Sequence, residues 1–273
     1  MKDFSGKTVY IMGGSSGIGL ATANLLSGEG AHVIIFARRK KRLESALEEI
    51  SGCRCSEEQR FCCVQMDVSI REQVAAAMSR AVSDFGVPEV LINFAGRAYP
   101  RIFEHITYEQ FDNTMKINLY GTWNTVSALV PHMKERGGYI VNVSSQAGFI
   151  GVFGYTDYSA SKFAIVGFSE ALRSELKPYG ITVSVLCPPD TDTPGFHEEN
   201  KTKPEETKAI SASAGLMQPD EVARALIKGM RKEDFIIVPG FDGKFTFMAK
   251  RLFPGLVEFI MDRTIRKVQT KEC

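Results

Sequence analysis

Short apolar segments alternate with longer segments of helical periodicity along most of the chain. The apolar segments occupy residues 8–12, 33–37, 61–66, 90–93, 139–144, 182–187 and 235–238. Strands that alternate with helical crossovers form parallel βαβ units. Nearly every position in these strands is apolar, which is typical of strands covered by helices on both faces. The pattern predicts an α/β fold, a single doubly wound Rossmann-type domain with a mainly parallel seven-stranded sheet.

Two segments interrupt this alternation. Residues 190–213 are polar and too long for an ordinary connection, so we expect an active-site lid or, alternatively, a disordered surface loop. Residues 244–273 mix aromatic and aliphatic side chains with lysine and arginine, which predicts an amphipathic, basic extension. Pro254 and Gly255 divide this extension into pieces too short to span a membrane. We therefore expect a catalytic domain at residues 1–243 followed by the extension.

The composition of the 273-residue chain is that of an ordinary globular protein, with 44% apolar residues and a formal net charge of +1. Its acids and bases are interspersed, which argues against nucleic acid as a partner. The N-terminal residues lead directly into the first predicted strand, so we expect no signal peptide or N-terminal membrane span and a cytoplasmic location. The six cysteines are unevenly spaced, which favours reduced thiols and no metal site.

A glycine-rich turn follows the first predicted strand and leads into a helix. Glycines at such a point let the backbone approach a pyrophosphate, whose charge is stabilised at the helix N-terminus. A tight turn without any ligand has a similar sequence, so the turn alone is weak evidence. The residues expected to contact the cofactor here are Gly13, Ser15, Ser16, Gly17, Ile18 and Gly19.

The residues after the second predicted strand indicate which dinucleotide binds. NAD-binding units carry an acid there to hold the ribose 2′-hydroxyl, whereas this chain has Arg38 and Arg39, with Arg42 nearby. A guanidinium group is permanently charged and suits phosphate, so we expect NADP(H), although a basic surface turn has the same composition. Further cofactor contacts are expected after the third, fourth and sixth strands, at Asp67, Val68, Asn93, Ala95, Gly96, Pro188, Thr191 and Thr193.

Tyr158 and Lys162 are four residues apart in a predicted helix, so both lie on one face. The ammonium group is expected to lower the pKa of the phenol toward working pH, where proton transfer is efficient. This spacing is common on exposed helices, but two further groups give it meaning. Ser145, with Ser144 as the alternate, follows the fifth strand, where a hydroxyl can polarise a carbonyl. Asn118 is expected to hold a proton-relay water, and a buried amide bonded to backbone is compatible with that role.

Together, the glycine turn, residues 93–96, Asn118, Ser145, and the Tyr158 and Lys162 pair resemble the short-chain dehydrogenase/reductase family over about residues 7–238. The resemblance implies a seven-stranded doubly wound sheet and assembly as a homodimer or homotetramer. It also implies direct hydride transfer between NADP(H) and a carbonyl carbon, with Tyr158 as the general acid and with both Tyr158 and Lys162 contacting the cofactor.

Three positions depart from the usual pattern of that family. Met12 replaces a threonine before the glycine turn, and Phe94 replaces the second asparagine of its motif, which loosens the expected hydrogen bonding around the adenosine. Pro189 replaces a frequent glycine after the sixth strand and stiffens the start of the lid. None of these positions carries the chemistry.

Residues 188–205, with residues 144–148 and 158–165, are similar to the branch of this family that reduces 3-ketodihydrosphingosine. That resemblance implies a long-chain keto sphingoid base as substrate, dihydrosphingosine as product, and a place in sphingolipid synthesis with NADPH as the reductant. Two alternatives remain open: reduction or oxidation of another lipophilic carbonyl or alcohol (steroid, retinoid or acyl-thioester), and a non-catalytic dinucleotide-binding scaffold.

A substrate that combines an amine with a long alkyl chain requires a carboxylate and an apolar channel. The predicted lid carries Asp190, Asp192, Glu198 and Glu199, which can pair with an ammonium or remain solvated. The apolar residues of the 244–273 extension leave three roles open, which are lining the channel, lying on a membrane surface and packing at a subunit interface. Peripheral membrane contact and interface packing are the favoured two.

Overall fold

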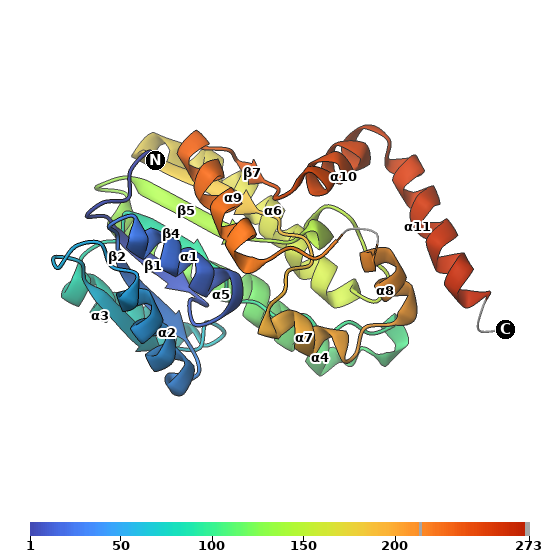
Figure 1. The fold of residues 1–273 in the computed structure, drawn as a ribbon, viewed down its shortest axis with the longest axis horizontal. Coiled ribbons are helices and arrows are strands. Elements are labelled where there is room, and N and C mark those ends of the chain that lie inside the picture. The colour runs from blue at the N-terminus through green and yellow to red at the C-terminus, as the bar shows by residue number, and fades with distance from the viewer. Residues whose placement is uncertain (213–214, 271–273) are drawn as a thin grey trace.

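The computed structural model describes residues 1–212 and 215–270, so Ser213 of the predicted lid and residues 271–273 of the extension lie outside the described part. One sheet has the order β3-β2-β1-β4-β5-β6-β7, and every pair of neighbouring strands is parallel (Figure 1). The strand order reverses between β1 and β4, the point at which such sheets bind ligands. The strands are β1 (Thr8–Met12), β2 (His32–Ala37), β3 (Phe61–Gln65), β4 (Val90–Asn93), β5 (Gly138–Val143), β6 (Ile181–Leu186) and β7 (Ile236–Ile237).

Both faces of the sheet are buried, which explains why its strands are apolar throughout. In β1, Val9 and Ile11 pack into the core on one face while Tyr10 and Met12 pack into the core on the other. The prediction of a doubly wound sheet is confirmed, although β7 is shorter than the predicted strand at 235–238. Helices α1 (Gly17–Gly28), α2 (Lys40–Gly52) and α9 (Pro219–Lys232) cover the first face, and α3 (Arg71–Phe85), α5 (Gly121–Met133) and α6 (Thr156–Leu176) cover the second.

A π-helical turn joins two helices beside the sheet. Helix α4 (Tyr108–Met115) continues through Lys116–Tyr120 into α5, so Asn118 lies in the wide turn and not in a regular helix as predicted. Such turns are rare and often occur at functional sites, because the added residue turns one side chain out of the regular helical register. The turn directs Asn118 into a buried position.

The predicted lid contains two short helices, α7 (Pro194–Asn200) and α8 (Glu205–Ala212). Thr193 caps α7 by accepting a hydrogen bond from the Phe196 amide at 3.1 Å, and Pro194 occupies the first helical position, where its missing N–H costs nothing. The structure therefore gives residues 190–212 two helices and their connecting turns.

The C-terminal extension forms helices α10 (Phe241–Leu252) and α11 (Pro254–Gln269), which separate at the predicted break. Because α10 begins at Phe241, the predicted boundary after residue 243 falls within its first turn. Helix α11 runs beside α8 of the lid, where Gln269 donates to Glu206 at 3.2 Å (Figure 1). Among residues 1–212 and 215–270, none of the helices combines the length and the apolar character that crossing a membrane requires.

Candidate active site

A hydroxyl and a phenol meet at the carboxyl end of β5. Ser145 follows this strand and caps a short 3-10 turn (Gln146–Gly148), with its Oγ accepting from the Ala147 amide at 3.1 Å. The Ser145 side chain hydrogen-bonds with Tyr158, which lies in the first turn of α6. The alternate residue, Ser144, instead donates to the Lys162 carbonyl oxygen at 2.8 Å. The structure therefore brings Ser145, and not Ser144, to the phenol.

Lys162 is buried one turn along α6 from Tyr158. Its Nζ lies 5.6 Å from the centroid of the Tyr158 ring and donates a hydrogen bond to the Val143 carbonyl oxygen at 2.9 Å. Burial lowers the pKa of Lys162 to about 8, because the charged form is poorly solvated there. The predicted placement of phenol and ammonium on one helical face is observed.

The pKa of Tyr158 shifts in the direction opposite to that expected. Burial raises it above the ordinary value, the charge of Glu199 raises it further, and the hydrogen bond with Ser145 lowers it. Desolvation outweighs the neighbouring hydroxyl because a phenolate would be buried without a direct ion pair to Lys162. The phenol therefore holds its proton, which is the form that a general acid needs.

Asn118 is a buried amide bonded mainly to backbone. Its Nδ2 donates to the Arg97 carbonyl oxygen at 3.0 Å and to Ser161 Oγ at 2.9 Å, and its Oδ1 accepts from the Arg97 amide at 2.9 Å. A Cβ atom built on Gly96 would lie 3.3 Å from both Asn118 Oδ1 and Lys162 Nζ. Asn118, Gly96 and Lys162 thus lie close together, and the relay between Asn118 and Lys162 stays a prediction.

Two polar residues that position α6 were missed in the sequence. The buried carboxylate of Asp157 accepts from Thr114 Oγ1 at 2.8 Å and from the Tyr158 amide at 2.8 Å, which fixes the start of α6 against α4. Ser161 Oγ donates to the Tyr158 carbonyl oxygen at 2.7 Å. The sequence offered one sign of the role of Asp157, because an acid in the first turn of a helix is favoured by the helix dipole.

The glycine turn is packed so closely that side chains are excluded. Gly13 has a φ of 80°, and a Cβ atom there would lie 2.8 Å from the Ala95 amide nitrogen. Gly17 has a φ of 56°, and a Cβ atom there would lie 2.9 Å from Thr193 Cγ2. A Cβ atom on Gly19 would overlap the Gly13 carbonyl oxygen. The turn, the end of β4 and the start of the lid therefore come together, with partly exposed residues Ser15, Ser16 and Ile18 on the turn.

Three exposed guanidinium groups gather beyond the end of β2, from Arg38, Arg39 and Arg42. The pKa of Arg39 is lowered by partial burial and then by the charges of Arg42 and Arg38, as expected when like charges are close. A carboxylate oxygen of Asp67, Oδ2, lies 3.7 Å from Arg38 Nη1. The cluster has an excess of positive charge that suits a phosphate group.

Several predicted cofactor residues use their polar groups inside the protein. Asn93 donates to Asn142 Oδ1 at 2.9 Å and accepts from Thr125 Oγ1 at 2.8 Å, so its amide joins β4, β5 and α5. Thr191 Oγ1 donates to the Pro189 carbonyl oxygen at 2.9 Å. Buried polar groups need such partners, so these side chains hold the site's framework. The carbonyl oxygens of Val68 and Pro188 likewise accept hydrogen bonds, from Asn124 Nδ2 and the Gln146 amide.

Residues 7–204 match the short chain dehydrogenase family, and the chain belongs to that family of oxidoreductases. It is 42% identical to a 3-dehydrosphinganine reductase of Danio rerio over 88% of this chain and 73% of that protein. It is 38% identical to a 3-ketodihydrosphingosine reductase of Dictyostelium discoideum over 93% of this chain and 80% of that protein. The predicted family resemblance is confirmed.

Solved structures share the fold over nearly the whole chain. A short-chain dehydrogenase/reductase from Burkholderia phymatum in complex with NAD has a TM-score of 0.81 at 23% identity, covering 95% of this chain and 96% of that one. The L-sorbose reductase of Gluconobacter frateurii, complexed with NADPH and L-sorbose, has a TM-score of 0.77 at 26% identity, covering 87% of this chain and 97% of that one. Both similarities support the fold described above.

Proposed function

We propose that this oxidoreductase reduces the keto group of 3-ketodihydrosphingosine, giving dihydrosphingosine for sphingolipid synthesis, with NADPH as the reductant. The proposed substrate is supported by relatives bearing that activity in their names, at 42% and 38% identity over most of this chain. The observation that carries the chemistry is the partly exposed Tyr158 phenol hydrogen-bonded with Ser145.

The cofactor site fits NADP(H). Ser16 occupies the N-cap position of α1 in an extended conformation, but its side chain makes no hydrogen bond to the helix, so it leaves the first-turn amides able to receive a pyrophosphate. The guanidinium groups of Arg38, Arg39 and Arg42 supply the charge that a 2′-phosphate needs, since this phosphate distinguishes NADP(H) from NAD(H). When bound, the reduced nicotinamide supplies the hydride.

The chain's own residues bind the substrate carbonyl and transfer the proton to it. Ser145 donates a hydrogen bond to the carbonyl oxygen and stabilises the negative charge that develops on it. The phenol of Tyr158 gives its proton to that oxygen as the alkoxide forms. Lys162 binds the cofactor ribose and carries the replacement proton toward Tyr158, and Asn118 orients a water molecule that connects Lys162 with solvent. The raised pKa of Tyr158 keeps the acid form available for reduction.

The proposal is tested by measuring NADPH oxidation with 3-ketodihydrosphingosine and with a panel of steroid, retinoid, acyl-thioester and sugar carbonyls. Turnover of the panel alone would refute the proposed substrate.

The mechanism is tested by Tyr158→Phe, which is expected to lower kcat by about 10²–10⁴-fold because the proton donor is lost, with NADPH affinity retained. Tyr179→Phe, at a half-exposed position beyond the opposite end of α6 from Tyr158, is the matched control. Full turnover by Tyr158→Phe would refute the mechanism.

We also propose that the two extension helices contact a membrane surface peripherally, on its cytoplasmic side. Large apolar side chains, including Phe245, Leu252, Leu256 and Phe259, are exposed on α10 and α11 among lysine and arginine residues. That combination binds anionic lipid surfaces. Sedimentation with vesicles that contain or lack an anionic lipid should show binding to the anionic ones, and Phe245→Glu with Leu256→Glu should abolish it. Equal sedimentation of the wild type and the variant with anionic vesicles would refute the membrane contact.

A homodimer or homotetramer is the proposed assembly. Trp123 on α5 and Phe163 on α6 are exposed, and Trp123 lies 5.5 Å from Phe168 of α6, so these two neighbouring helices share an apolar outer face. Burial of such a face in an assembly stabilises it. Light scattering of the wild type and of Trp123→Glu should show that the variant dissociates, and a monomeric wild type would refute the assembly.

A further inference from the structure

Four of the acids in the predicted lid, Asp190, Asp192, Glu198 and Glu199, fall into two pairs with different surroundings. Asp192 pairs with His197 at 2.9 Å and Glu198 pairs with Lys201 at 2.7 Å, and all four of these side chains are well exposed. Asp190 and Glu199 instead turn inward onto a third lid residue, Lys203, at 3.1 Å and 3.2 Å. The Lys203 side chain is 1% exposed, whereas Asp190 is 27% and Glu199 16% exposed, so in this cluster the lysine is buried and the two carboxylates are partly open to solvent.

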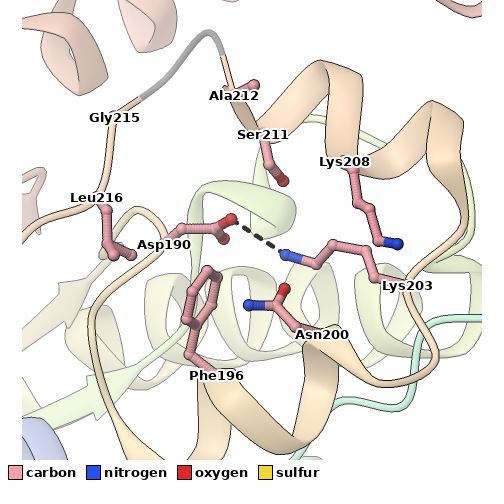
Figure 2. Close-up of a pocket in the computed structure, with 9 residues that line it drawn as sticks. All are labelled: Asp190, Phe196, Asn200, Lys203, Lys208, Ser211, Ala212, Gly215 and Leu216. Carbon is pink, nitrogen blue, oxygen red and sulfur yellow. Dashed lines mark hydrogen bonds and ion pairs between the residues drawn. The ribbon is translucent and has the colours of Figure 1, made fainter.

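Asp190 and Lys203 line a cavity of about 320 Å³ together with residues of α7, α8 and the segment after α8, and Glu199, which does not line the cavity, contacts Lys203. Figure 2 shows Asp190 and Lys203 pointing toward one another across this cavity, with the Phe196 ring beside them. The Lys203 ammonium lies 4.7 Å from the centroid of the Phe196 ring and 5.9 Å from that of Tyr155. Carboxylates and aromatic faces together form a favourable environment for a primary ammonium group.

This cluster lies next to the catalytic phenol. The Tyr155 hydroxyl donates a hydrogen bond to Glu199, and the ring of Tyr155 packs against that of Tyr158 with centroids 5.4 Å apart. On the other side, the amide of Gln146 donates to the Pro188 carbonyl oxygen at 3.0 Å, which joins the turn after Ser145 to the chain segment leading to Asp190. An ammonium at the acids would therefore lie beside a carbonyl held by Ser145 and Tyr158.

The charges of the cluster leave room for one more cation. Lys203 balances only one of the two carboxylates, Asp190 and Glu199, that it contacts. Lys208 also lines the cavity, but its ammonium pairs with Glu205 at 2.6 Å toward solvent. A carboxylate that remains unbalanced in a partly buried site favours binding of a cationic ligand.

We propose that Asp190 and Glu199 bind the ammonium group of a long-chain amino ketone whose carbonyl, on the adjacent carbon, is held by Ser145 and Tyr158. This inference rests on the proposed function and identifies how its substrate is distinguished from other lipophilic ketones. Lys203 keeps the two carboxylates oriented between substrate binding events, because it fixes both in one geometry.

The test compares 3-ketodihydrosphingosine with the same long-chain ketone lacking the amine, using NADPH oxidation. Glu199→Gln is expected to raise KM for the amino ketone about tenfold or more and to change KM for the ketone without the amine by less than about twofold. Glu198→Gln, on the same helix but facing solvent, is the matched control and should change neither value. Equal effects of Glu199→Gln on both ketones, or no effect on either, would overturn the inference.

A binding measurement separates this inference from the proposed function. Calorimetric titration with dihydrosphingosine and with its analogue lacking the amine requires no turnover, and wild type should bind the amine about tenfold or more tightly. Asp190→Asn should reduce that difference, which provides a second variant if Glu199→Gln fails to fold. Amine-selective binding without reduction of 3-ketodihydrosphingosine would refute the function alone. Equal affinity of wild type for the two compounds would overturn the inference, whatever the enzyme reduces.

Discussion

Gly19 offers the sharpest test of how tightly the cofactor turn is packed. A Cβ atom at this position would overlap the Gly13 carbonyl oxygen and lie 3.1 Å from the Gly13 carbonyl carbon and 3.3 Å from Gly14 Cα. All three atoms belong to the backbone of the turn, so no flexible side chain can move aside. Gly19→Ala must therefore displace the turn itself or the start of α1.

Overpacking of this kind costs about 1–3 kcal/mol, and Gly19→Ala belongs at the upper end of that range because backbone must shift. A loss of about 3 kcal/mol lowers Tm by roughly 6–12 °C in a domain of this size. Displacement of the amides at the start of α1 should also weaken NADPH binding about tenfold or more. Thermal unfolding and NADPH titration measure the two effects.

Gly28, at the other end of the same helix, is the matched control. A Cβ atom there would lie 3.8 Å from the nearest atom, the Cys53 carbonyl oxygen, which is ordinary contact. Gly28→Ala should raise stability by about 0.5 kcal/mol, because alanine loses less backbone entropy on folding, and should leave NADPH affinity unchanged. If Gly19→Ala has the same stability and the same NADPH affinity as the wild type, the packing argument is refuted.

Three further predictions concern charge, protonation and the core. Arg38→Ala should weaken NADPH binding about tenfold while leaving NADH binding unchanged, and an unaltered preference would show that another residue reads the 2′-phosphate. The pKa of Lys162 is lowered from 10.5 to about 8, so between these values only the unfolded chain keeps the proton and the free energy of unfolding rises with pH. Urea unfolding across this range should show that Lys162→Met lacks this rise, and equal pH dependence in both proteins would contradict the assigned shift. Leu226→Ala, in the buried face of α9, should lower the free energy of unfolding by about 2–5 kcal/mol in chemical unfolding, with KM unchanged. A smaller loss would show that the neighbouring side chains relax into the space that the leucine leaves, against this prediction.

The fold could be predicted because the sequence carries its signals locally. The apolar strands need both faces covered, and the glycine turn marks the first crossover, so the sheet and its cofactor edge are readable without coordinates. The relation between Tyr158 and Lys162 was equally local, since four residues along a helix fix one face. These features depend on spacing within single elements.

Features that depend on burial could not be predicted from the sequence in the same way. Lys203 stands in a charged, polar segment that is typical of solvent-exposed chain, yet it is buried between two carboxylates. The pKa of Tyr158 moves upward because desolvation exceeds the effect of its polar neighbours, and desolvation depends on the packed lid. Asp157 was missed because its partner, Thr114, is brought to it by a separate helix.

The parallel order of the sheet also has a consequence for how the protein folds. Strand β1 pairs with β4, and the whole of the β2 and β3 units lies between them in the chain. Pairing of strands so distant in sequence is slow, because the loop between them must close before any contact is gained. The β1–β4 junction is where the glycine turn meets the end of β4, so the cofactor site is expected to form only after much of the helical structure. In refolding from denaturant, recovery of NADPH binding should therefore lag behind recovery of helical circular dichroism.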